Sequence, residues 1–240
     1  MEDLAITIVL EKKTKNYLVF GANGYLGNAL CDYLANDETV EVVRATRSDT
    51  SETAISVSKP SWTNQISTTE KFDGVAWCQG MNSSGGLLEE SESEILKVYQ
   101  ANVSFITSTL RDLIQVNALA RPCRLVIFSS VWQELARPQK LSYILSKAAI
   151  SGLVPALAAD LAADEISVNA VLPGVVDSPM TRKKLTEDQI KMVEASTPGG
   201  QLVDALAVAR VAKWLLCSES SGVNAQSIVV DNGWSRIRNV

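Results

Sequence analysis

The chain has 240 residues, of which 46% are hydrophobic, so it is long enough to bury the core of one α/β domain. Its 22 basic and 27 acidic residues give a net charge of −5, which argues against a nucleic-acid partner or an anionic membrane surface. The sequence has no histidine, which excludes Ser-His-Asp triads and the common histidine-containing zinc sites. The four cysteines are scattered without a C-x-x-C pair, and the sequence has neither a signal-peptide pattern nor a long apolar run. We therefore expect a cytoplasmic protein with no metal site and no membrane association.

The first 16 residues contain one apolar run, residues 4–10, followed by charged residues. We interpret residues 1–16 as an N-terminal extension, either an extra strand or an ordered arm. Residues 17–240 are interpreted as a single domain, because a second domain is not expected at this length.

A glycine turn follows the first strong strand pattern. Residues 17–20 form a short apolar run that leads directly into Gly21, Gly24 and Gly27 and then into a helical pattern. Glycines permit a tight turn and a close approach of the backbone, and the free amides at a helix start attract an anion, so this segment could hold a phosphate. The same spacing also occurs in plain turns, but the position directly after a strand favours a dinucleotide site.

The second strand pattern, residues 40–45, ends without an acidic residue and is followed by Arg47. In dinucleotide-binding folds this strand end meets the adenosine ribose, where an acid suits a free 2′-hydroxyl and an arginine suits a 2′-phosphate. The sequence therefore favours NADP over NAD. Two alternatives stay open: Asp49 could accept a ribose hydroxyl, and Arg47 could be a solvated loop charge.

Strand patterns then alternate with helical ones along the rest of the chain. The predicted strands are 54–57, 72–77, 125–128, 166–172 and 227–230, and the predicted helices are 90–114, the segment that opens with Tyr143, and 204–216. Residues 178–197 are charged and are predicted to be a mobile segment of the kind that acts as a lid. The alternation predicts an α/β fold of the Rossmann type, a doubly wound, mostly parallel seven-stranded sheet with helices on both faces.

The strongest chemical signal lies between residues 125 and 149. An apolar strand delivers the hydroxyl of Ser130, and the helix that follows places Lys147 four residues after Tyr143. Residues at i and i+4 share a helix face, and a cation near a phenol lowers its pKa, so Tyr143 is a candidate proton donor and acceptor. Taken alone, a Tyr-x-x-x-Lys pair is more often an amphipathic tyrosine and a solvated lysine.

These separated signals resemble the short-chain dehydrogenase/reductase family over residues 17–234. The glycine turn is similar to the family's cofactor-binding loop, and Ser130, Tyr143 and Lys147 match its catalytic serine and Y-x-x-S-K motif. Asn102 matches the helix asparagine that completes the family's tetrad. The ending, QSIVVDNGWS, is similar to the family's C-terminal strand and turn.

The resemblance also implies a cofactor site. Residues 169–174, which read Asn-Ala-Val-Leu-Pro-Gly, resemble the segment that flanks the nicotinamide, and Ser178 stands where a threonine often meets the carboxamide. The implied cofactor-binding residues are Gly21, Asn23, Gly24, Tyr25, Leu26, Gly27, Arg47, Gly80, Tyr143, Lys147, Pro173, Gly174, Val176 and Ser178.

By this resemblance Tyr143 is the general acid/base and Ser130 orients the reacting oxygen. Lys147 would hold the nicotinamide ribose and lower the pKa of the tyrosine, and Asn102 would keep a water for the proton relay. The implied activity is that of an NAD(P)-dependent carbonyl reductase or alcohol dehydrogenase that interconverts a ketone and a secondary alcohol. A 3-oxoacyl thioester and a keto-sugar are the candidate substrates, and a homotetramer or homodimer is the expected assembly.

Three departures from the family pattern leave other functions open. The usual N-N-A-G becomes Trp-Cys-Gln-Gly at residues 77–80, where we expect Trp77 to add bulk near the adenine ribose. Ser56 or Ser58 replaces a common aspartate after the third strand, and Tyr25 stands where standard-length members usually carry a glycine. The alternatives are a non-catalytic dinucleotide-sensing binding protein and a lyase or epimerase that uses the cofactor transiently.

Overall fold

The computed structural model describes residues 14–47, 54–58, 61–66 and 69–237 of the protein. Within them, seven strands form one sheet in the order β3-β2-β1-β4-β5-β6-β7, and every neighbouring pair is parallel. The strands are β1 (Lys15–Phe20), β2 (Val40–Thr46), β3 (Ala54–Ser56), β4 (Phe72–Trp77), β5 (Leu119–Phe128), β6 (Ile166–Pro173) and β7 (Ser227–Val230). The strand order reverses between β1 and β4, so the predicted doubly wound sheet of the Rossmann type is confirmed.

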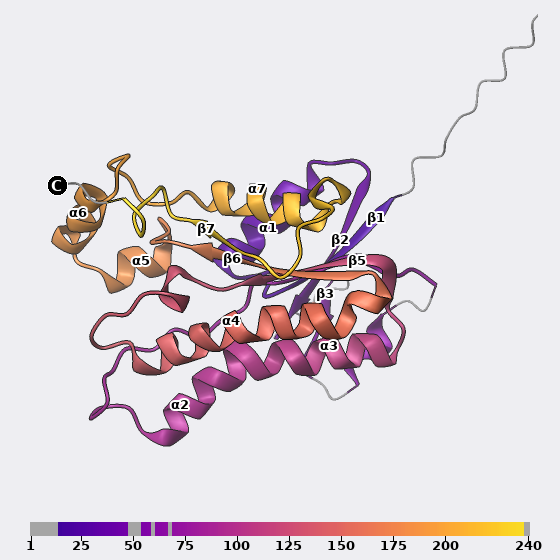
Figure 1. Ribbon diagram of the computed structural model, residues 1–240, viewed down its shortest axis with the longest axis horizontal. Helices are drawn as coiled ribbons and strands as arrows, with labels where there is room; N and C mark the ends of the chain where they lie inside the picture. Colours follow the sequence, from indigo (N-terminus) through magenta and orange to yellow (C-terminus); the bar gives the residue numbers. More distant parts are fainter. Residues whose placement is uncertain (1–13, 48–53, 59–60, 67–68, 238–240) are drawn as a thin grey trace, which may run out of the picture.

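Helices cover both faces of this sheet (Figure 1). On one face lie α1 (Tyr25–Ala35) and α7 (Ala205–Leu216), and on the other lie α2 (Glu92–Tyr99), α3 (Phe105–Gln115) and α4 (Leu141–Leu161). Two short helices, α5 (Pro179–Lys184) and α6 (Glu187–Ser196), follow the carboxyl end of β6. Because both faces are covered, alternate residues of each strand enter separate cores, as Leu18 and Phe20 do on one side of β1 and Tyr17 and Val19 on the other.

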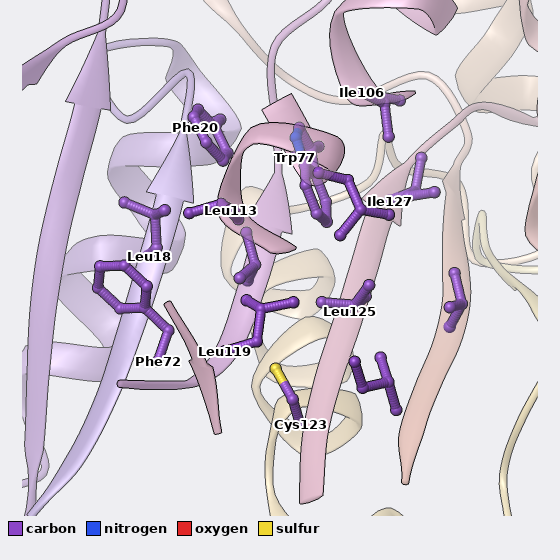
Figure 2. Close-up of a cluster of buried hydrophobic side chains, with 14 of the residues drawn as sticks. Leu18, Phe20, Phe72, Trp77, Ile106, Leu113, Leu119, Cys123, Leu125 and Ile127 are labelled. Atoms are coloured by element: carbon purple, nitrogen blue, oxygen red, sulfur yellow. The ribbon is translucent and has the colours of Figure 1, made fainter. Parts of the chain in front are cut away.

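Trp77 belongs to the core between the sheet and α3 (Figure 2). Its ring stacks on Phe20 with centroids 5.5 Å apart, and its indole Nε1 donates to Thr109 Oγ1 at 2.9 Å. The side chain is only 1% exposed. The expectation that Trp77 adds bulk near the adenine ribose is therefore wrong, because strand alternation turns this side chain into the core.

The strand predictions agree with the structure in part. The predicted bounds of β4 and β7 match, whereas β5 begins at Leu119 rather than at residue 125. The first part of β5 mixes exposed residues, Arg121 and Pro122 among them, with buried ones. An apolar run marks only the part of such a strand that helices cover on both sides.

The predicted helix over 90–114 is divided into three parts. α2 begins after Ser91, which forms a capping box with Glu94. Residues Gln100–Ser104 then form a π-helical turn that contains Asn102, and α3 follows it. The helical hydrogen-bond ladder is therefore opened locally at Asn102.

The segment predicted to be charged and mobile, residues 178–197, contains α5 and α6. Ser178 and Thr186 cap these helices, since each hydroxyl accepts a hydrogen bond from the backbone amide three residues later. The capping box of Thr186 with Gln189 was the sequence signal for a helix that the charge pattern concealed. Lid motion in this segment stays a prediction.

The domain starts slightly earlier than predicted. β1 begins at Lys15, whose Nζ lies 2.6 Å from Asp73 Oδ1, and the amide of Asn16 donates to the same carboxylate at 3.0 Å. The strand or arm expected at residues 4–10 lies outside the described residues.

The helical stretch Leu141–Asp164 is long and apolar enough to cross a membrane by length and composition, with a mean hydropathy of 1.5. It contributes Ile150 and Val154 to the core beneath the sheet, and core helices pass the same test. The outward positions of α4 include the exposed small residues Gly152 and Ala156.

Candidate active site

The candidate site lies at the carboxyl ends of the central strands. The glycine turn follows β1, Gly80 follows β4, Ser130 follows β5 and Ser178 follows β6. In a doubly wound sheet these strand ends meet at one edge, and ligands bind where the strand order reverses. The fold thus brings together residues from four separate parts of the sequence.

The glycine turn is packed so tightly that Gly21 and Gly27 have no room for a Cβ atom. Gly21 has a φ of +73°, and a Cβ atom there would lie 2.6 Å from the backbone nitrogen of Gln79. A Cβ on Gly27 would lie 2.2 Å from the carbonyl oxygen of Gly21. Gly24 occupies the N-cap of α1 without a capping side chain, which leaves the first amides of α1 available to an anion.

An open groove of about 710 Å³ runs beside this turn. Asn23, Gly24 and Tyr25 line it together with Pro179 and Met180 of α5. The turn is therefore accessible from solvent, and the first residues of α5 share its groove.

The segment after β6 is held by backbone packing and capping. Gly174 lies against Asp231, since a Cβ on the glycine would be 2.7 Å from the Cβ of that aspartate. The Ser178 hydroxyl accepts from the amide of Thr181 at 3.1 Å, and the Thr181 hydroxyl donates to the carbonyl of the buried Val176 at 2.7 Å. These contacts fix the backbone that follows Pro173 at the end of β6.

The two arginines of the second strand region lie in different environments. Arg44 donates to Asn28 Oδ1 at 3.0 Å and pairs with Asp32 Oδ1 at 2.9 Å, so it is engaged with α1. Arg47 follows β2, is exposed and forms no ion pair within the described residues. Asp49, the alternative ribose partner, lies outside the described residues. The hydroxyls of Ser56 and Ser58, the two candidates for the position of the missing aspartate, lie 3.1 Å apart.

Ser130, Tyr143 and Lys147 lie together. The Ser130 hydroxyl lies near the phenol of Tyr143 and acts to lower its pKa, and the Lys147 ammonium is 5.8 Å from the centroid of the Tyr143 ring. Lys147 is buried and donates to the carbonyl of Phe128 at 2.9 Å. Burial raises the pKa of Tyr143, an effect that the Ser130 hydroxyl opposes, and burial lowers the pKa of Lys147 to about 8.

Asn102 connects the loop after β4 to the helix of Tyr143. Its Oδ1 accepts from the amide of Met81 at 2.6 Å, and its Nδ2 donates to the carbonyl of Met81 at 3.0 Å. The same Nδ2 lies 2.8 Å from Ser146 Oγ, which in turn donates to the carbonyl of Tyr143 at 2.8 Å. The π-helical turn thereby fixes the backbone of both neighbouring elements.

Sequence reasoning missed several polar groups of the site. It gave no role to Lys140, which is buried directly before α4, and it did not identify Ser146 as the link between Asn102 and the backbone of Tyr143. Both amide atoms of the Gln79 side chain are buried without a hydrogen-bond partner among the described residues. In sequence, Lys140 belongs to a polar loop with Arg137, a pattern typical of solvated residues, so no local signal marked it.

The described residues fit a bound dinucleotide. The glycine turn offers bare backbone and free helix amides to a pyrophosphate, and the backbone of Gln79, whose side-chain amide has no partner among the described residues, lies beside that turn. A Cβ on Gly80 would lie 3.5 Å from Asn102 Oδ1 and 3.8 Å from Lys147 Nζ, so this glycine keeps the backbone close to the catalytic candidates. No cluster of side chains that could hold a metal ion occurs in the described residues.

Fold and site together define a Rossmann-type protein of the dinucleotide-binding class. A family model described as enoyl-(acyl carrier protein) reductase matches residues 38–235. The 3-oxoacyl-[acyl-carrier-protein] reductase FabG of Rickettsia felis is 27% identical over 229 residues, which cover 95% of this chain and 90% of that protein. The 2-keto-3-deoxy-L-fuconate dehydrogenase of Xanthomonas campestris is 28% identical over 171 residues, which cover 68% of this chain and 57% of that protein.

A solved structure agrees with these relatives. The crystal structure of a short chain dehydrogenase family protein from Francisella tularensis superimposes with a TM-score of 0.82 at 25% identity and covers 93% of this chain and 100% of that chain. The chain therefore belongs to the short-chain dehydrogenase/reductase family, whose members are oxidoreductases that generally use NAD or NADP.

Proposed function

We propose that the protein interconverts a ketone and a secondary alcohol with Tyr143 as the general acid/base. The observation that carries this proposal is the grouping of Ser130, whose hydroxyl acts to lower the pKa of the Tyr143 phenol, with the Lys147 ammonium 5.8 Å from the tyrosine ring. A proton donor, a hydrogen-bond donor and a cation therefore converge on one position for a reacting oxygen.

Each residue has a separate role in this reaction. Tyr143 gives its proton to the carbonyl oxygen during reduction and takes it back during oxidation, and Ser130 donates a hydrogen bond to the same oxygen. Lys147 orients the nicotinamide ribose and supplies positive charge beside the phenol. Asn102 holds a water that connects this site to solvent. The nicotinamide cofactor supplies the hydride.

NADP is the preferred cofactor in this proposal. Thr46 ends β2 where NAD-binding members of dinucleotide folds carry an acid, and the exposed Arg47 follows it. The residues that would hold the cofactor are Gly21, Asn23, Gly24, Tyr25, Leu26, Gly27, Arg47, Gly80, Tyr143, Lys147, Pro173, Gly174, Val176 and Ser178.

The relatives support the two substrate classes considered from the sequence. One is named as a 3-oxoacyl-[acyl-carrier-protein] reductase, which fits a 3-oxoacyl thioester, and another as a 2-keto-3-deoxy-L-fuconate dehydrogenase, which fits a keto-sugar. A cytoplasmic location agrees with four free cysteines at positions 31, 78, 123 and 217. The small apolar residues on the outer surface of α4 support a homodimer or homotetramer.

Purified protein mixed with NADPH, NADH and a panel of ketones and secondary alcohols distinguishes the candidate functions. A reductase oxidises NADPH in step with ketone consumption. An epimerase or lyase converts its substrate without net change in nicotinamide absorbance, and a sensing protein binds the nucleotide without turnover. We expect stoichiometric oxidation of NADPH, and either of the other two results would refute the reductase proposal.

A further inference from the structure

A second lysine lies beside Tyr143. Lys140 precedes α4, is 5% exposed, and its Nζ is 5.5 Å from the centroid of the Tyr143 ring. The ammonium donates to Asn82 Oδ1 and to the carbonyl of Ser83, both at 2.6 Å. These contacts fasten the loop between β4 and α2 to the start of the catalytic helix, and they place a buried cation at the edge of the proposed reaction site.

Two further cations, Arg137 and Lys184, act on Lys140 through their charges. The guanidinium of Arg137 lies 5.5 Å from the centroid of the Trp132 ring, and the amide of Trp132 is 3.4 Å from the hydroxyl of Ser130. Lys184 ends α5, which Figure 1 shows at the same end of the molecule as the loop between β5 and α4. Burial, followed by the charges of Lys184 and Arg137, lowers the pKa of Lys140 to about 8.

These three cations lack carboxylate partners. In the part of the chain that the structure describes, ion pairs engage Lys15, Arg44, Arg121, Arg182, Lys213 and Arg236. Arg137, Lys140 and Lys184 take part in none of them. Glu90 is the acid whose charge acts on Lys140, but its two carboxylate oxygens accept from the amide and the hydroxyl of Ser142, at 2.8 and 2.9 Å.

Unneutralised like charges destabilise a fold, and such clusters next to a reaction centre are typical of sites that bind an oppositely charged ligand. We propose that Lys140, Arg137 and Lys184 form a subsite for an anionic group of the substrate, a carboxylate, sulfonate or phosphate only a few bonds from the reacting carbon. This inference rests on the proposed function and narrows it. A keto acid, including a keto-sugar acid, fits the subsite, whereas an uncharged ketone leaves the cations unmatched.

A comparison of keto acids with their own esters tests this subsite. We would measure NADPH-dependent reduction of pyruvate, acetoacetate and levulinate and of their methyl esters at neutral pH. The wild type is expected to prefer at least one acid over its ester by about tenfold or more in kcat/KM. In Arg137→Gln and in Lys184→Gln, kcat/KM for the acid should fall about tenfold because KM rises, while kcat/KM for the ester stays unchanged.

Lys191→Gln is the matched control, because Lys191 is an exposed lysine on the neighbouring helix α6. This variant should keep the wild-type ratio of acid to ester. Equal use of acids and esters by the wild type, or an unchanged ratio in both subsite variants, would overturn the proposal. Arg137 and Lys184 are exposed, so their replacement tests the subsite without disturbing the buried Lys140.

Calorimetric titration separates the subsite from the proposed reaction. The same acids and esters are titrated into wild-type protein and into the double variant Arg137→Gln/Lys184→Gln. This measurement of binding does not require turnover. Tighter binding of an acid to the wild type by about tenfold, with no such difference for its ester, supports the subsite even when nothing is reduced. If the acids bind with this preference but none is reduced, the proposed function is refuted and the subsite is not. Absence of any difference in binding refutes the subsite, whatever the turnover assay gives.

Discussion

Tyr143 is subject to opposing influences on its proton. The sequence led us to expect that Lys147 lowers the pKa of this phenol, but burial raises it, and only the Ser130 hydroxyl works in the other direction. Burial also lowers the pKa of Lys147 to about 8. At neutral pH the site thus combines a protonated phenol with a charged ammonium, which is the protonation state that reduction of a carbonyl requires.

The anionic subsite predicts a specific pH dependence. The pKa of Lys140 is about 8, so its positive charge is present below that pH and is lost as the pH rises through it. The kcat/KM for a keto acid should therefore fall relative to that for its methyl ester between about pH 7 and 9. The groups that face Lys140 are Arg137, Lys184 and Glu90, together with the ring of Tyr143.

The ratio of kcat/KM for the acid to kcat/KM for the ester isolates the effect of Lys140. The pKa of Lys147 is also about 8, but Lys147 acts on both substrates, so its contribution cancels in the ratio. A ratio that stays constant across this pH range would contradict the part assigned to Lys140.

Arg47 provides the test of cofactor preference. Replacing it with alanine removes the charge that we expect to meet the 2′-phosphate, so the Kd for NADPH should rise by about tenfold or more. Fluorescence titration with NADH is the internal control, because NADH lacks that phosphate and its Kd should be unchanged. If both Kd values rise equally, Arg47 does not discriminate between the nucleotides.

At the level of elements, the glycine turn depends on close packing of α1 against β1. Alanine normally stabilises a helix relative to glycine by about 0.5–1 kcal/mol. In Gly27→Ala, however, the new Cβ would lie 2.2 Å from the carbonyl oxygen of Gly21, which is backbone and cannot rotate away. We expect the free energy of unfolding to fall by about 2–4 kcal/mol and NADPH binding to weaken.

Gly152→Ala on α4 is the matched control. It is also a glycine within a helix, and a Cβ added there would have no neighbouring atom within 4 Å, so urea denaturation should show no loss of stability. Equal stabilities for the two variants would mean that the turn is not as tightly closed as the structure describes.

The elements that the sequence predicted well are those with a strong periodic signal. Residues 17–20 and 125–128 are buried throughout and form continuous apolar runs, and the glycine turn and the spacing of Tyr143 and Lys147 are local features of the chain. The short helices α5 and α6 were missed because their residues are mainly polar and only their caps mark them. Lys140 could not be recognised, because its burial depends on Asn82 and Ser83, which are distant in the sequence.

At the scale of the whole molecule, the outer surface of α4 leads us to expect an oligomer. Leu145 is 48% exposed, and the exposed positions of this helix include Ala156 and Ala159. Small apolar residues on a helix surface allow a second copy to approach closely. Light scattering should give a mass of two or four times 25.9 kDa, and Ala156→Glu should shift the protein toward the monomer. A monomeric mass for the wild type would contradict this expectation.

In the proposed reaction, one tyrosine performs proton transfer in a site assembled from distant parts of the fold. The most direct test is the effect of Tyr143→Phe on NADPH-dependent turnover, with NADPH affinity measured on the same preparation. Tyr99→Phe is the control, because Tyr99 is 41% exposed at the end of α2. We predict that Tyr143→Phe binds NADPH as the wild type does but loses about 10²–10⁴-fold in kcat, while Tyr99→Phe keeps both properties. Undiminished turnover by Tyr143→Phe would contradict the account.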